Sequence, residues 1–270
     1  MTATEPAASD TMAADLSPQP APGATPPRTP LVARAAAELV GTAALVAIVV
    51  GSGIQATDLT DDVALQLLAN STATVFGLGV LIALLGPVSG AHFNPAVTLA
   101  EWWTARRGGA GVNTRELTIY VPAQIVGGIL GAILADAMFG EPLVKWSTHE
   151  RSAGNLLLGE VVATAGLILL IFGLARTDQL RFAPVAVASY IGAAYWFTSS
   201  TSFANPAVTI GRAFTNTFAG IAPGSVPAFI GMQLIGTAGG LALVAVIFMR
   251  GRTDFMRGRA DFARGRTDGE

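Results

Sequence analysis

Six long apolar stretches restrict this chain to membrane folds more strongly than any other feature of its sequence. Each has about 20 residues, the length that spans the hydrocarbon core of a bilayer as a helix. They occupy residues 35–54, 66–86, 117–138, 155–175, 183–200 and 226–249. Charged residues make up only 13% of the chain, too few to cover the surface of a soluble protein. The sequence therefore predicts an all-α protein with six transmembrane helices in a lipid bilayer.

Composition also excludes several kinds of site. The chain has no cysteine and only two histidines, His92 and His149, so we expect no metal and no cofactor. The net charge of −2 gives no reason to expect a nucleic-acid partner. No nucleophile–base pair can be assembled from the motifs, so we do not expect an enzyme. His149 is interpreted as a surface residue.

The two ends of the chain are predicted to be tails. Residues 1–30 are rich in Pro and Ala and predict a disordered N-terminal tail. Residues 251–270 belong to an Arg-Gly-Arg repeat, which we interpret as a solvated tail, with RNA or anionic-lipid contact as the alternative. Most basic residues outside the second tail lie before the first stretch or between alternate stretches, at Arg28, Arg34, Arg106, Arg107, Arg115, Arg176 and Arg181. On the opposite side, the loop between the third and fourth stretches has only Lys145 and Arg151. This bias predicts a multi-pass plasma-membrane protein with both termini in the cytoplasm.

Residues 31–250, which hold all six stretches, consist of two related halves, about 31–140 and 153–250. Residues 38–51 align with residues 160–173, with six of 14 residues identical. Further pairs recur in the same order: Asn94-Pro95-Ala96-Val97-Thr98 with Asn205-Pro206-Ala207-Val208-Thr209, and Gln124, Gly127 and Gly131 with Gln233, Gly236 and Gly240. Each half has three spans, an odd number, so the second half is predicted to be inverted. Such repeats place a solute path at mid-membrane between the halves.

The repeated motif predicts two re-entrant half-helices. Asn is a preferred helix N-cap and Pro is favoured at the first helical position, so helices should begin at Pro95 and Pro206. The first can run for about ten residues before Arg106, or about 15 Å, half of the membrane core. The second should end between Thr215 and Gly220. Their N-termini would meet at the midplane and disfavour cations, while the Asn94 and Asn205 amides remain free to donate to a solute. A single Asn-Pro-Ala would indicate no more than a helix start.

These marks resemble those of the major intrinsic protein family, the aquaporins and glycerol facilitators. The resemblance covers residues 31–250, and its specific motifs are residues 89–98 and 203–209. It implies an aquaporin-like homotetramer with one pore per subunit. It also implies passive passage of water and small uncharged solutes, either glycerol-like polyols or arsenite-type metalloid acids.

The resemblance also points to a selectivity filter. Water-selective members usually carry arginine directly after the second Asn-Pro-Ala, where this chain has Val208. Counting from Asn205 as the family does adds Ser202 and Ala193. The fourth filter residue is Phe76, or Thr74 if the spacing to Asn94 sets the alignment. These residues predict a wide filter, to which Arg212, one turn beyond Val208, could restore charge.

Several residues keep more than one interpretation. Glu38 and Glu160 could relay protons, but the repeat and the resemblance favour a role in holding the re-entrant loops. His92 could be a pH gate, although a histidine fixed by loop hydrogen bonds is favoured. Gln124 and Gln233 are predicted to link helices. For the whole chain, the alternatives to a channel are an alternating-access transporter and a non-conducting membrane scaffold.

Overall fold

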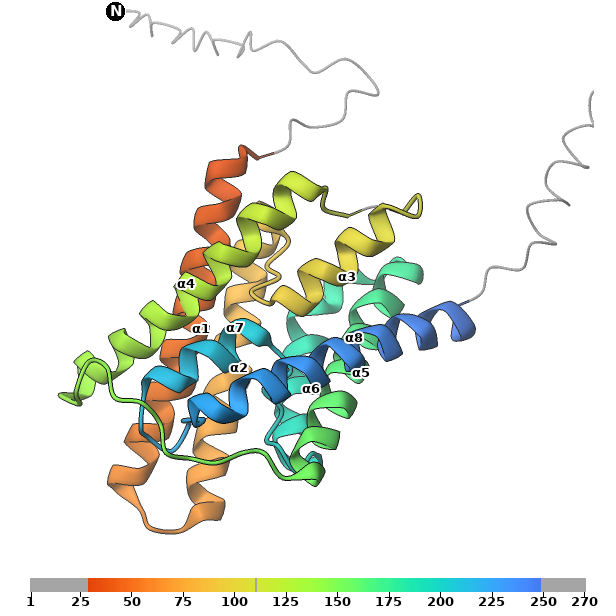
Figure 1. The fold of residues 1–270 in the computed structure, drawn as a ribbon. Helices are drawn as coiled ribbons and strands as arrows, with labels where there is room; N and C mark the ends of the chain where they lie inside the picture. Colours follow the sequence, from red (N-terminus) through yellow and green to blue (C-terminus); the bar gives the residue numbers. More distant parts are fainter. Residues whose placement is uncertain (1–28, 110, 249–270) are drawn as a thin grey trace, which may run out of the picture.

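The computed structural model describes residues 29–109 and 111–248, and these residues form a helical bundle (Figure 1). The predicted tails lie outside the described residues, apart from residues 29 and 30. The α-helices are α1 (Leu31–Leu59), α2 (Val63–Ser89), α3 (Pro95–Ala105), α4 (Thr114–Phe139), α5 (Gly154–Arg176), α6 (Ala183–Phe197), α7 (Pro206–Gly211) and α8 (Val226–Ile247). Short 3-10 turns occupy Leu180–Phe182, Arg212–Phe214 and Pro223–Ser225. The predicted all-α class is confirmed.

Five segments are long and apolar enough to cross a membrane: α1, α2, α4, α5, and α8 with the 3-10 turn before it. The fifth predicted span, residues 183–200, is shorter than expected, because α6 has 15 residues and ends at Phe197. Thr198 is in an extended conformation, and its hydroxyl donates to the carbonyl oxygen of Ala194 at 2.7 Å. The turn Leu180–Phe182 lengthens this span at its other end.

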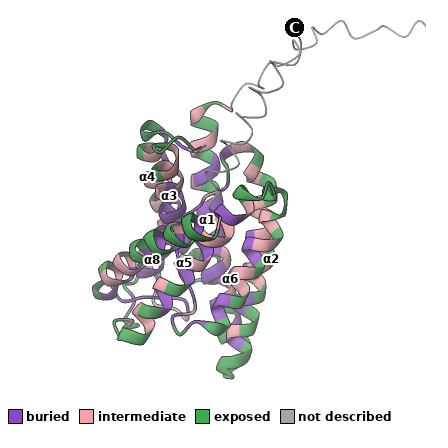
Figure 2. Cartoon of the chain, turned by 90° about the vertical axis from the view of Figure 1, so that its right-hand side faces the viewer, coloured by how far each residue is buried: buried purple, intermediate pink, exposed green. Residues whose placement is uncertain are grey.

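The helix packing repeats in the two halves. α1 packs against α4 and α2, while α5 packs in the same way against α8 and α6. Contacts between α2 and α6 join the halves, and the short helices α3 and α7 contact each other. Exposed residues lie on the outer faces and at the helix ends, with buried residues in the interior (Figure 2). Many exposed side chains on the long helices are large and apolar, as a bilayer requires.

Matched glycines set the closest helix contacts. A Cβ atom at Gly127 of α4 would lie 2.3 Å from the carbonyl oxygen of Leu39 on α1. A Cβ atom at Gly236 of α8 would lie 2.6 Å from the carbonyl oxygen of Val161 on α5. Only a hydrogen atom fits at these distances, and such small residues let membrane helices approach closely. The same two helix pairs bury the glutamines three residues before these glycines.

Candidate functional site

The two short helices begin at the prolines of the repeated motif, as predicted. The Asn94 Oδ1 atom accepts a hydrogen bond from the Ala96 amide at 2.9 Å, and Asn205 Oδ1 accepts one from the Ala207 amide at 3.0 Å. α3 has 11 residues, close to the expected length. α7 has only six and ends earlier than expected, although the 3-10 turn Arg212–Phe214 extends it.

The capping asparagines also connect the two re-entrant loops. Asn94 Nδ2 donates to the carbonyl oxygen of Ala204 at 2.8 Å, and Asn205 Nδ2 donates to the carbonyl oxygen of Phe93 at 2.7 Å. The expectation that both amides are wholly free is therefore wrong. An amide nitrogen carries two hydrogens, so each asparagine retains one donor for a solute.

A buried glutamate holds the first re-entrant loop. Glu38 Oε1 accepts from the His92 amide at 3.0 Å and from Ser89 Oγ at 2.6 Å. Its Oε2 atom accepts from the Phe93 amide at 2.7 Å and from Gln124 Nε2 at 2.8 Å. Both carboxylate oxygens are fully used, which is the contact pattern that the predicted loop-holding role requires.

The second loop repeats this arrangement with fewer donors. Glu160 Oε1 accepts from the Phe203 amide at 2.9 Å. Its Oε2 atom accepts from the Ala204 amide at 2.8 Å and from Gln233 Nε2 at 2.7 Å. The predicted links from Gln124 and Gln233 thus run from α4 to Glu38 on α1 and from α8 to Glu160 on α5.

Both loops adopt the same strained backbone. Ala91 and Phe93 have φ angles of 50° and 47°, and the equivalent Ser202 and Ala204 have 51° and 47°. Positive φ at a non-glycine residue costs about 1–3 kcal/mol and persists only where the surroundings enforce it. The glutamates supply that constraint, because they bind consecutive amides on each strained segment.

The His92 side chain is only 4% exposed and is held by residues of α3 and α4, which agrees with the fixed histidine favoured over a pH gate. Its Nδ1 atom lies 3.0 Å from Thr98 Oγ1, and its Nε2 atom lies 3.3 Å from Glu101 Oε1. Its ring also meets the edge of Tyr120, with centroids 5.6 Å apart. His149, in contrast, is exposed in the loop between α4 and α5.

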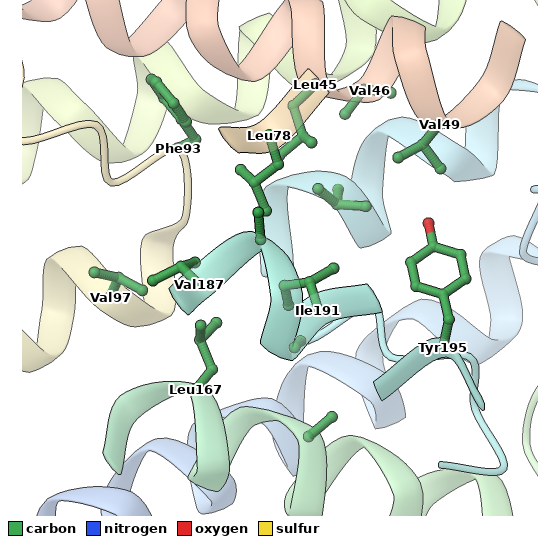
Figure 3. Packing of buried hydrophobic residues seen from close by; sticks show 14 of the residues in the cluster. Leu45, Val46, Val49, Leu78, Phe93, Val97, Leu167, Val187, Ile191 and Tyr195 are labelled. Carbon is green, nitrogen blue, oxygen red and sulfur yellow. The ribbon is translucent and has the colours of Figure 1, made fainter. Parts of the chain in front are cut away.

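A central cavity of about 60 Å³ lies between the halves. At roughly 10–15 Å³ per water, it has room for about four to six water molecules. Figure 3 shows apolar side chains converging on this region from α1, α2, α5 and α6, with the Tyr195 ring reaching in from α6. The predicted residues that line the cavity are Asn94, Asn205, Ser202 and Val208. Ser202 Oγ is buried and has no hydrogen-bond partner among the described residues.

Four predicted pore residues do not line the cavity: Pro95, Ala96, Pro206 and Ala207. They are buried at the helix starts. Helical geometry turns their side chains away from the cavity. The first residue after each motif that lines the cavity is Val97 on α3 and Val208 on α7.

Two predicted filter residues also need correction. Phe76 is 70% exposed and lies on the outer surface, whereas the alternative, Thr74, is 2% exposed and lines the cavity. Ala193 is exposed, and Tyr195, two positions later, takes its place in the cavity wall. The Tyr195 hydroxyl lies 3.2 Å from Thr74 Oγ1, so these residues bridge α2 and α6. Counting back from Asn205 by the family's spacing selects the wrong residue on α6. The residues of α6 that line the cavity are Ile191 and Tyr195, which are one helical turn apart.

Arg212 lines the central cavity. The sequence had left open whether this residue restores charge to the filter. Its side chain is buried, its Nε atom donates to the Ala219 carbonyl oxygen, and its guanidinium carbon lies 3.5 Å from the Phe203 ring centroid. A helical side chain leans toward the N-terminus of its helix, which brings Arg212 over the turn that contains Val208. Tyr195 and Arg212 thus add a hydroxyl group and a cation to a wall for which Val208, Ser202 and Ala193 had been predicted.

Two larger cavities share lining residues with the central cavity. One, the α3 mouth, has about 410 Å³, includes Glu101 and Arg181 in its lining, and shares His92 and Val97 with the central cavity. The other, the α7 mouth, has about 220 Å³ and shares Arg212 with it. Its lining residues are Val63, Leu67, Asn70, Arg151, Thr201, Arg212 and Phe218. Sequence patterns gave no signal for Arg151, which lies in an irregular loop.

Comparisons with known proteins agree with this architecture. Residues 28–201 match the family described as major intrinsic protein. The chain is 48% identical over 214 residues to Aquaglyceroporin AqpS of Rhizobium meliloti (strain 1021), an alignment that covers 79% of this chain and 89% of that protein. It is 34% identical over 150 residues to an aquaglyceroporin of Toxoplasma gondii, covering 54% and 53% of the two chains.

A solved structure, the aquaglyceroporin from Plasmodium falciparum, has the same fold, with a TM-score of 0.58 and 18% identity. The match covers 82% of this chain and 98% of that one. Because the family match spans more than half of the chain, and the bundle and the paired motifs agree with it, this chain belongs to the major intrinsic protein family.

Proposed function

We propose that this protein is a passive channel for water and small uncharged solutes. The observation that carries the proposal is the central cavity, which shares lining residues with both mouths and is lined by both capping asparagines. The aquaglyceroporin names of its relatives support glycerol-like polyols as solutes. Passage through such a path requires no chemical step, so the protein is not an enzyme.

The wall of the cavity suits solutes that accept hydrogen bonds. Most lining side chains are apolar, while Asn94, Asn205 and Ser202 offer polar atoms along the path. A neutral solute can exchange its water contacts for these groups at low cost. A cation would lose its hydration shell and meet the Arg212 charge and the positive ends of the short helices.

We assign the α3 mouth to the cytoplasmic side of the plasma membrane. Six spans place both termini on one side, and the loops between α2 and α4 and between α5 and α6 carry the basic residues Arg106, Arg107, Arg115, Arg176 and Arg181. The α7 mouth is then external. The exposed apolar faces suit lipid and neighbouring subunits, and we propose a homotetramer with one pore per subunit.

Neutral metalloid acids such as arsenite are a second class of solute. Arsenous acid presents hydroxyl groups at a size close to that of glycerol, and the site would meet both through the same donors. Val208 at the filter leaves space that an arginine at this position would occupy.

Liposome swelling tests the proposal. Purified protein should raise water and glycerol flux above that of protein-free liposomes, with a low activation energy and without saturation. Arsenite uptake is measured on the same preparations. Saturable flux that requires an ion gradient would indicate a transporter, and flux equal to that of protein-free liposomes would indicate a scaffold. Either result would overturn the proposal.

A further inference from the structure

The α7 mouth contains two arginines and, among its described lining residues, no acid. Arg151 comes from the loop between α4 and α5, and Arg212 from the turn after α7. Their guanidinium carbons lie 5.1 Å and 3.5 Å from the centroid of the same ring, Phe203. Two like charges thus lie close together at one end of the path.

Neutral groups hold these charges in place. Arg151 Nε donates to the carbonyl oxygen of Gly220 at 3.0 Å. Arg212 Nε donates to the carbonyl oxygen of Ala219, which directly precedes Gly220 in the chain. The π face of Phe203 attracts both cations. Each guanidinium has five N–H donors, and neither forms an ion pair within the described part of the chain. Several donors on each fork are therefore left for a ligand.

The surroundings compensate the Arg151 charge only in part. Burial lowers the pKa of Arg151, because the cost of dehydrating the guanidinium exceeds the attraction of Glu160. Glu160 is itself committed to the re-entrant loop. An anion that entered the α7 mouth would meet two unpaired cations in a cavity of about 220 Å³.

We propose that the α7 mouth is a binding site for a small monovalent oxyanion. Arginine forks match the geometry of carboxylate and related oxygen pairs and bind them through charge-assisted hydrogen bonds. Because Arg212 also lines the central cavity, the bound anion blocks the entrance and slows the flux of neutral solutes. This inhibition rests on the proposed channel function, whereas the binding itself does not.

The two mouths should respond differently. At the α3 mouth, Glu101 lies beside His92 and shares the lining with Arg181, so an acid opposes the positive charge there. An oxyanion should therefore inhibit from the α7 side alone.

Binding is tested on the detergent-purified full chain by calorimetric titration with methanesulfonate. This oxyanion stays ionised at working pH, and dimethyl sulfone is a neutral probe of similar shape. Methanesulfonate should bind and dimethyl sulfone should not. Arg151→Gln should weaken binding about tenfold, the value of one charge-assisted hydrogen bond. Lys145→Gln, which removes an exposed cation from the same loop, should leave it unchanged.

Equal binding of the two probes, or no binding of either to the wild-type chain, would overturn the site without relying on any variant. An equal loss in Lys145→Gln would also overturn it, because general surface charge would then explain the effect. In oriented liposomes, methanesulfonate should slow water flux from the α7 side and not from the other. If methanesulfonate binds but the protein carries no water flux, the channel function is refuted and the oxyanion site stands. If water flux is normal but methanesulfonate does not bind, the oxyanion site is refuted and the channel function stands.

Discussion

The two re-entrant loops share one backbone design but differ in the side chains that face the mouths. Two residues before the asparagine, the first loop has His92 and the second has Phe203; seven residues after it, they have Glu101 and Arg212. His92 pairs with Glu101 at 3.3 Å, and the Arg212 guanidinium carbon lies 3.5 Å from the Phe203 centroid. The same two positions therefore meet in both halves, with opposite charge at the second.

The rings behind these pairs repeat as well. Tyr120 of α4 meets His92 edge-on, with centroids 5.6 Å apart, and Phe229 of α8 meets Phe203 edge-on at 5.3 Å. Both interplanar angles are 70°. The duplicated scaffold thus fixes where side chains lie, while individual substitutions set the polarity of each mouth.

The largest expected effect tests the shared part of the design. Glu38 accepts two donors at each oxygen, so Glu38→Gln leaves two donors unsatisfied in either amide orientation. Glu160 accepts one donor at Oε1, so Glu160→Gln need lose only one. At about 1–3 kcal/mol per donor, we expect losses of about 2–6 and 1–3 kcal/mol in folding stability.

Thermal unfolding of the detergent-purified variants measures this difference. Glu141→Gln, at an exposed position, is the control and should match the wild type. If water flux through the wild type required a proton gradient and Glu38→Gln removed that requirement, the glutamate would be a proton relay and not a support.

The next effect tests the contact between the loops. Asn94→Asp and Asn205→Asp each replace a donor to a carbonyl oxygen by a carboxylate that repels it. We expect water flux to fall about tenfold, which corresponds to about 1.4 kcal/mol in the barrier, and cation leak to rise. Stopped-flow swelling and a potassium-leak assay measure the two. Folded variants with unchanged flux and leak would remove the asparagines from the path.

A smaller effect distinguishes the loops from each other. Val97 and Val208 are equivalent and line the same cavity. Val208→Arg places a second cation one turn from Arg212 and should reduce glycerol flux several-fold more than water flux. In Val97→Arg the new cation lies one turn from Glu101, whose negative charge opposes it. The ratio of glycerol flux to water flux should therefore change less than in Val208→Arg. Equal losses of water and glycerol in Val208→Arg would show that this position does not select solutes.

The smallest effect concerns the bridge between α2 and α6. Tyr195→Phe removes the hydroxyl that lies 3.2 Å from Thr74 Oγ1. One neutral hydrogen bond contributes about 0.5–1.5 kcal/mol, so folding stability should fall by about that amount, and water flux should change less than in the asparagine and Val208 variants. Phe76→Leu, on the outer surface, is the matched control. A larger change in flux from Phe76→Leu would reinstate Phe76 as a filter residue.

The sequence was sufficient for the scaffold because its signals are local and periodic. Asn-Pro caps place the starts of α3 and α7, and the paired Gly127 and Gly236 indicate the close helix contacts. The filter was harder, because residue counting across the loop after α6 ignores its strained backbone. The spacing of four from Ile191 to Tyr195 was a usable signal for the cavity-lining face. Arg151 had none, because tertiary folding alone brings that loop over Phe203.

The reciprocal asparagine contacts also determine when the first re-entrant loop can be completed during synthesis of the chain. Asn94 and its partner Ala204 are 110 residues apart, and chains grow at about 5–20 residues per second. The amide of Asn94 and the carbonyl of Phe93 therefore wait roughly 5–20 seconds for the second loop. Unpaired polar groups are costly in the hydrocarbon core, so the first loop is expected to stay near the headgroups during that interval. We therefore expect both loops to enter the membrane together, in one late step.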